Sequence, residues 1–110
     1  MAQRFIFRNN VSSRLLMAIT PNQTTLTVLP GDGEKFPEPD YEPAGGGEWF
    51  AVTLWDRASG VREICYCTGR AGDELTVLRG REGTTPFAFP AGAEVAMTIT
   101  AGILEFLRDL

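Results

Sequence analysis

Residues 49–79 read WFAVTLWDRASGVREICYCTGRAGDELTVLR, and this stretch decides the fold. It contains three runs rich in β-branched and aromatic residues, at 49–56, 61–68 and 74–79, which is typical of strands. The short segments between the runs hold glycine and polar residues that favour turns. The stretch therefore predicts a three-stranded antiparallel meander.

The first of these runs carries apolar residues on both faces of the predicted strand. Phe50, Val52 and Leu54 lie on one face, and Trp49 and Trp55 lie on the other, because side chains alternate along a strand. This pattern predicts burial on both sides of the strand, or burial of one face against a partner.

The last strand of the meander repeats an earlier phrase. LTVL at 75–78 also occurs at 26–29, and a glycine follows each copy within two residues, Gly80 and Gly31. The sequences around the two copies differ, so the chain lacks the full repeating unit that a duplicated domain would show. We interpret the two copies as strands that end in the same kind of turn.

The rest of the chain, with its 12 glycines and 7 prolines, predicts short elements joined by irregular segments. The segment 15–20 fits a helical turn or a strand equally well. The other expected elements are an extended arm at 1–12, a strand at 24–29, a Pro/Gly-rich surface loop at 34–48, a second irregular stretch at 80–92, a strand at 93–100 and a helix at 101–110 capped by Thr100. The predicted fold is mainly β, a small antiparallel sandwich or barrel-like single domain spanning 1–110.

Composition narrows the classes of function. The net charge of −4 argues against a nucleic-acid-binding surface, which is normally basic. No stretch approaches the roughly 20 apolar residues of a membrane span. The N-terminal segment is interrupted by Arg4 and Arg8, so we expect no signal peptide, and we expect synthesis in the cytoplasm.

The residues that usually carry chemistry are scarce. The chain has no histidine, which excludes the common catalytic triads. Cys65 and Cys67 stand two apart in a predicted strand, and we expect them to be small buried side chains rather than a disulfide or a metal site. The sequence therefore predicts no catalytic residue, no cofactor and no metal.

The order of phrases along nearly the whole chain resembles a known type of module. RFIFRNN, TTLTVLPGDGEKFP, EWFAVTLW, GDELTVLRGREGT and TAGIL follow one another as in a small module of tailed-bacteriophage and prophage tail or tail-fibre proteins. The resemblance implies a non-enzymatic virion structural protein of the virion-attachment type. Such proteins often continue into a longer chain, which leaves open a free-standing adaptor or part of a fibre.

That resemblance implies function through protein–protein contacts, with copies of itself and with other tail proteins, and a trimer is the first expectation. We expect no nucleic acid and no membrane as partners. For each candidate contact residue the alternative is packing in the core of its own chain. The candidates are Phe5, Phe7, Asn9, Asn10, Tyr41, Phe87, Phe89, Ile103, Phe106 and Leu107.

A second function fits the same composition. A small β-barrel module could bind a carbohydrate or another cell-surface ligand on a platform of exposed rings. Trp49, Trp55 and Tyr41 are the rings that would have to be exposed together for this function.

Overall fold

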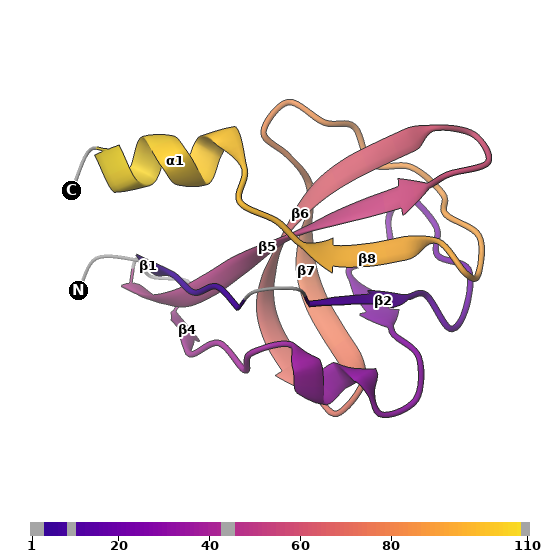
Figure 1. Ribbon diagram of the computed structural model, residues 1–110, viewed down its shortest axis with the longest axis horizontal. Coiled ribbons are helices and arrows are strands. Elements are labelled where there is room, and N and C mark those ends of the chain that lie inside the picture. Colours follow the sequence, from indigo (N-terminus) through magenta and orange to yellow (C-terminus); the bar gives the residue numbers. More distant parts are fainter. Residues whose placement is uncertain (1–3, 9–10, 43–45, 109–110) are drawn as a thin grey trace.

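A computed structural model describes residues 4–8, 11–42 and 46–108 of the chain (Figure 1). It is mainly β, as the sequence predicts. The elements in chain order are β1 (Arg4–Phe5), β2 (Ser12–Arg14), β3 (Thr25–Thr27), the 3-10 helix η1 (Asp32–Lys35), β4 (Tyr41–Glu42), β5 (Gly46–Asp56), β6 (Val61–Ala71), β7 (Glu74–Arg81), β8 (Glu94–Met97) and α1 (Ala101–Arg108).

The predicted meander is confirmed as β5, β6 and β7. Strand β5 pairs antiparallel with β6, with Val52 opposite Cys65, and β6 pairs antiparallel with β7. The tight turn between β5 and β6 is held by the Asp56 carboxylate, which accepts hydrogen bonds from the Ala58 amide at 3.2 Å and the Ser59 hydroxyl at 2.9 Å. These local bonds explain why DRASG reverses the chain there.

The strands form one sheet that curls into a half-barrel (Figure 1). Its order is β2-β8-β5-β6-β7-β3, and β1 and β4 add to the N-terminal end of β5. A bridge between Leu15 and Val28 joins the chain after β2 to the chain after β3, at the two ends of that order. Joining the two ends pairs edge strands that would otherwise be open.

The two LTVL phrases are neighbours in the sheet. Strand β3 pairs antiparallel with β7, and Leu26 lies directly opposite Leu75. The turn after the first phrase is also bound to the turn that precedes β7, because the Asp73 carboxylate accepts hydrogen bonds from the amides of Gly31 at 3.1 Å and Gly33 at 2.9 Å. The repeated LTVL phrase therefore corresponds to two strands that pair with each other, which the sequence interpretation did not predict.

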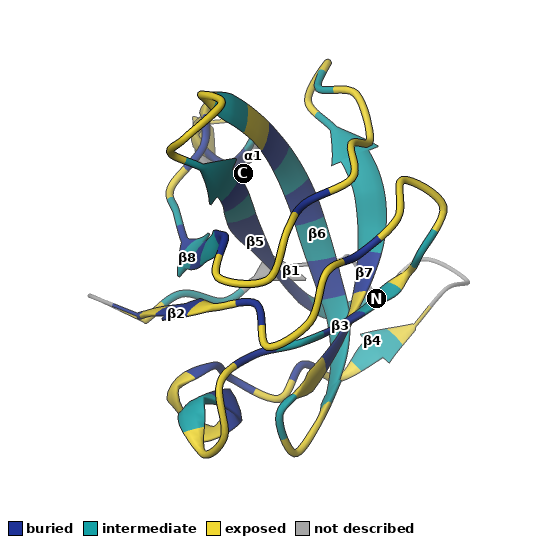
Figure 2. Cartoon of the chain, turned by 90° about the vertical axis from the view of Figure 1, so that its right-hand side faces the viewer, coloured by how far each residue is buried: buried dark blue, intermediate teal, exposed yellow. Residues whose placement is uncertain are grey.

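The main core lies inside the half-barrel. Phe50, Val52 and Leu54 of β5 are fully buried there, and along β6 buried residues alternate with less buried ones (Figure 2). On the other side of the sheet, which we call the outer face, Trp49 and Ala51 are buried against Ile103 of α1. The prediction that β5 is buried on both sides holds for its first half.

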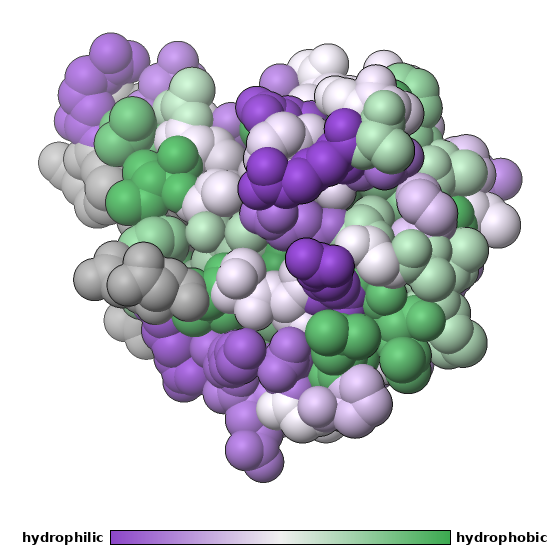
Figure 3. All heavy atoms as spheres, turned by 45° about the vertical axis from the view of Figure 1, so that its right-hand side comes forward, coloured by the Kyte–Doolittle hydropathy of each residue, from purple (hydrophilic) through white to green (hydrophobic). Residues whose placement is uncertain are grey.

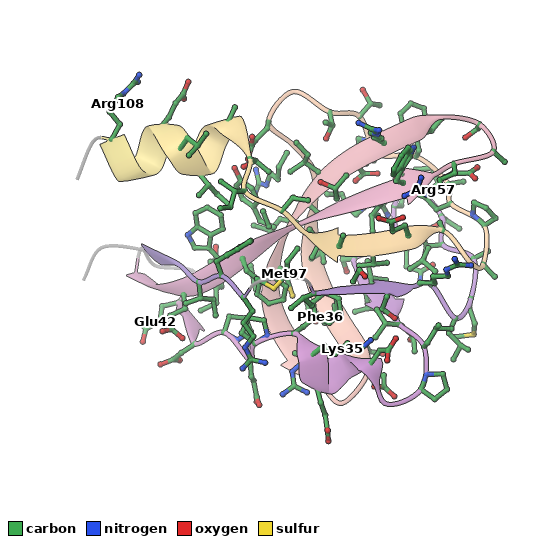
Figure 4. The ribbon with its side chains drawn as sticks, viewed as in Figure 1. Lys35, Phe36, Glu42, Arg57, Met97 and Arg108 are labelled. Atoms are coloured by element: carbon green, nitrogen blue, oxygen red, sulfur yellow. The ribbon has the colours of Figure 1, made fainter. Side chains whose placement is uncertain are left out.

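The segment 34–48 differs from the predicted surface loop. It includes β4 and the start of β5, and Phe36 is fully buried and stacks on Phe50 with ring centroids 6.0 Å apart. Figure 4 shows Phe36 and Met97 near the centre of the molecule. Proline and glycine exclude long regular elements, but they do not stop one aromatic side chain from packing inward.

The first strand, β1, and the C-terminal helix, α1, lie on the same side of the molecule (Figure 1). Where the sequence predicts an arm, β1 pairs in parallel with β5, with Phe5 opposite Trp49. Helix α1 begins after Thr100, whose hydroxyl accepts a hydrogen bond from the Ile103 amide at 3.2 Å. The predicted N-cap is confirmed.

Candidate contact site on the outer face of the sheet

A pocket of about 210 Å³ opens on the outer face beside α1, and we call it the aromatic pocket. Strands β5, β6 and β7 form its floor, and β4 adds one wall. Trp49 and Tyr66 lie in contact, with ring centroids 4.4 Å apart. The residues that line the pocket are Tyr41, Trp49, Tyr66, Thr68, Leu78 and Arg81.

A β-bulge places the charged residue of this pocket. Tyr66 faces Leu78 and Ile64 faces Arg81, so Cys65 of β6 lies opposite two residues of β7, Arg79 and Gly80. Gly80 has a φ of +61°, which a glycine adopts without strain. Because the bulge shifts the alternation by one, Arg79 points to the core and Arg81 to the outer face.

The guanidinium of Arg81 lies near Tyr66, 5.8 Å from the ring centroid. Its Nε is buried and makes no hydrogen bond to any of the described residues. A buried donor without an acceptor is unusual in folded proteins, because leaving one unpaired costs about 1–3 kcal/mol. Arg81 is therefore the cationic group of the pocket lining, and its Nε is not committed to a partner among the described residues.

Helix α1 is fastened beside the pocket by one carboxylate. Glu82 accepts hydrogen bonds from the Tyr66 hydroxyl at 2.7 Å, the Gly102 amide at 2.9 Å and the Thr100 hydroxyl. Burial alone would raise the pKa of Glu82, but these three hydrogen bonds outweigh it and hold the pKa below its usual range. A negative side chain at the start of a helix also suits the helix dipole.

This arrangement makes helix docking sensitive to acid. Because the folded-state pKa of Glu82 is lowered, its contribution is fully present above the unfolded value of 4.5 and is lost as pH falls through the folded value. We expect α1 to loosen below about pH 4.5, seen as lower protection of the Gly102 and Ile103 amides relative to their intrinsic exchange rates at the same pH. In Glu82→Gln, these protection factors should already be lower at pH 7 and should change less on acidification. An equal acid response in both proteins would contradict this role.

A second polar cluster, inside the half-barrel, is structural. Glu63 is fully buried and pairs with Arg79 through Nε at 2.7 Å and Nη2 at 2.9 Å. Its oxygens also accept the amides of Gly80 and Phe87, both at 2.9 Å. Burial on its own would raise the pKa of Glu63, but these bonds outweigh it and lower the pKa. With its hydrogen bonds satisfied and no exposed surface, Glu63 serves the fold.

The other tryptophan of β5 lies at the far end of the outer face. Trp55 has the Arg57 guanidinium carbon 3.9 Å and the Arg62 guanidinium carbon 4.0 Å from its ring centroid. Arg62 comes from β6 on one side, and Arg57 reaches toward β8 on the other, where it pairs with Glu94 at 3.0 Å. Both ring faces are therefore covered, and Trp49 is 7% exposed. The described rings do not form the platform expected for carbohydrate binding.

The structure separates the predicted contact residues. Tyr41 lines the aromatic pocket, and Phe7 packs partly buried against the core. Phe87 is exposed at 41%, whereas Phe89 and Ile103 are each 1% exposed and pack within the chain. For those two residues the structure supports the alternative of packing in the core of the same chain. Phe89 forms a β-bridge with Ile19, and Ile103 of α1 packs against Trp49 and Ala51.

The remaining candidates are placed only in part. Phe5 lies in β1, and Phe106 and Leu107 lie in α1, with side chains outside the described part. Asn9 and Asn10 lie outside the described residues.

Sequence reasoning missed Arg81 and Glu82, although the pattern GREGT after a strand could have indicated them. Gly80 directly follows the predicted strand 74–79, and in the structure it lies inside β7. A glycine inside a strand is a sign of a bulge, and a bulge changes which side chains reach the outer face.

The cysteines are buried, free and unreactive. Burial raises the pKa of Cys65, and it raises the pKa of Cys67 to about 12. A thiol is a poor nucleophile when its pKa is so far above neutrality. Across 4–8, 11–42 and 46–108, no group of three acidic or cysteine side chains could hold a metal ion.

Comparison with protein-family models and with curated protein sequences identifies no relative of this chain. No protein-family model matches the chain, and no curated protein sequence matches it. No helix among the described residues is long and apolar enough to cross a membrane.

Proposed function

We propose that this protein is a non-enzymatic structural component of a bacteriophage or prophage virion, a tail or tail-fibre adaptor that works through contacts with copies of itself and with other tail proteins. The order of sequence phrases supports the class of protein. One structural observation carries the mode of action: α1 stands out from the sheet (Figure 1) and exposes Leu104 at 58%, while its base is fixed by Glu82. Figure 3 shows hydrophobic atoms on this projecting part of the surface, at the upper left.

An exposed leucine on a firmly held helix suits a permanent contact. Burying one leucine in a partner is worth about 1.5–3 kcal/mol, and little ordering entropy opposes it when the helix is already docked. Ile99, just before α1, is also exposed at 54% and adds apolar surface near the helix.

We predict that the protein self-associates through this surface, with a trimer as the expected state. Leu104→Glu should weaken association at least about tenfold, because a carboxylate would have to be buried in the contact. Met17→Glu is the matched control, since Met17 is 60% exposed and lies beyond β2, away from α1. Sedimentation equilibrium from micromolar to millimolar protein measures both. A monomeric wild type, or equal loss in the two variants, would contradict this contact.

The second candidate function, carbohydrate binding on a ring platform, has no observation in its favour. Trp49 is buried, and two guanidinium groups cover Trp55.

A further inference from the structure

We propose that the aromatic pocket binds the C-terminal residue of a partner polypeptide, with its aromatic or aliphatic side chain inside the pocket and its terminal carboxylate on Arg81. This inference deepens the proposed function by naming the chemistry of the partner. It rests on that function only in taking the ligand to be a protein.

Charge is the first argument. Arg81 has no ion pair and no side-chain hydrogen bond among the described residues, and its guanidinium carbon lies 5.8 Å from the centroid of the Tyr66 ring. Glu82 is negative but forms no ion pair with Arg81, because its carboxylate oxygens accept hydrogen bonds from Tyr66, Thr100 and Gly102. A guanidinium fork pairs with a carboxylate through two parallel hydrogen bonds, and this pair is among the strongest in proteins.

The lining is the second argument. The side chains of Trp49, Tyr66 and Leu78 form apolar walls, so most of the pocket lining favours binding of an apolar group. The side-chain hydroxyl groups come from Thr68 and Tyr41, since the Tyr66 hydroxyl already bonds Glu82. A sugar ring carries hydroxyls around its whole edge, and each buried hydroxyl needs a partner. The pocket offers too few for a sugar.

Size is the third argument. Pockets for drug-sized ligands usually measure about 300–1,000 Å³. The aromatic pocket has about 210 Å³, which suits a single side chain and not an oligosaccharide or an extended cofactor. One anchoring side chain with a charge at its edge is a common pattern in protein–protein contacts.

The test uses the full chain and small probes, followed by ¹H–¹⁵N NMR. N-acetyl-phenylalanine carries the ring and the carboxylate, N-acetyl-phenylalanine amide carries the ring alone, and glucuronic acid is a carboxylated sugar. The indole N–H of Trp49 reports on the pocket. The indole N–H of Trp55, at the other end of β5, is the internal control. We expect a saturable shift at Trp49 with the acid, and binding at least about tenfold weaker for the amide.

Two variants sharpen the result. Arg81→Gln should weaken binding of N-acetyl-phenylalanine at least about tenfold, whereas Arg62→Gln removes an equal charge beside Trp55 and should leave binding unchanged. The acid–amide comparison needs no mutation, so it decides the question even if Arg81→Gln fails to fold. Equal binding of acid and amide, no saturable shift at Trp49, or tighter binding of glucuronic acid would overturn the proposal.

The outcome is separate from the proposed function. If the acid binds but the protein is absent from virions, the tail assignment fails and the pocket stands. If the protein is present in virions but the acid does not bind, only the pocket's ligand is wrong.

Discussion

Replacing Arg79 with methionine is expected to lower the free energy of unfolding by about 3–5 kcal/mol, a large share of the 5–15 kcal/mol typical of a folded domain. Removing the guanidinium would leave Glu63 charged and fully buried. It would also free the carbonyl groups of Thr20, Gln23 and Phe87, which accept from Arg79 at 2.7, 2.7 and 2.6 Å. Arg79 thus ties two irregular segments to β6 and β7.

Arg57→Met is the matched control for this prediction. Arg57 also pairs with a glutamate, but its side chain is 67% exposed, so its ion pair with Glu94 and its contact with Trp55 together are worth no more than about 1–2 kcal/mol. Urea unfolding of the three proteins, followed by tryptophan fluorescence, gives the comparison. Equal destabilisation by the two substitutions would show that the buried pair is not a main support of the fold.

Phe36→Ala is expected to cost about 3–5 kcal/mol as well, because it removes a fully buried ring and leaves a cavity against Phe50. Phe87→Ala is the control from an equally irregular, proline-flanked segment. Phe87 is 41% exposed, so its loss should cost about 1 kcal/mol or less. Thermal unfolding monitored by circular dichroism distinguishes the two. A similar fall in melting temperature for both would mean that Phe36 is not the core residue described above.

Local patterns explain what could be predicted from the sequence. The meander follows from alternation along 49–79 and from turn residues between the runs, and the cap at Thr100 depends on one side chain. Pairing of the two LTVL strands could not be predicted in this way. It joins Leu26 to Leu75 across half the chain, and nothing within either strand selects that partner.

The candidate site was harder to predict, because it depends on register and on long-range contacts. Tyr41 was identified as a contact residue from its place in a proline-rich segment, and it does line the aromatic pocket. Arg81 reaches the pocket only because the bulge at Gly80 changes the alternation of β7. Phe89 looked accessible beside Pro90, yet it is buried through its bridge to Ile19, a residue 70 positions away by number.

If, as we propose, a phage or prophage encodes this chain, the protein content of its purified virions tests the central claim most directly. Quantitative mass spectrometry of tails separated from heads should find the protein at a fixed copy number, a multiple of three if the trimer is correct. Leu104→Glu should lower that copy number, and Met17→Glu should not. If the protein is abundant in the lysate but absent from intact virions and tails, it is not a tail component.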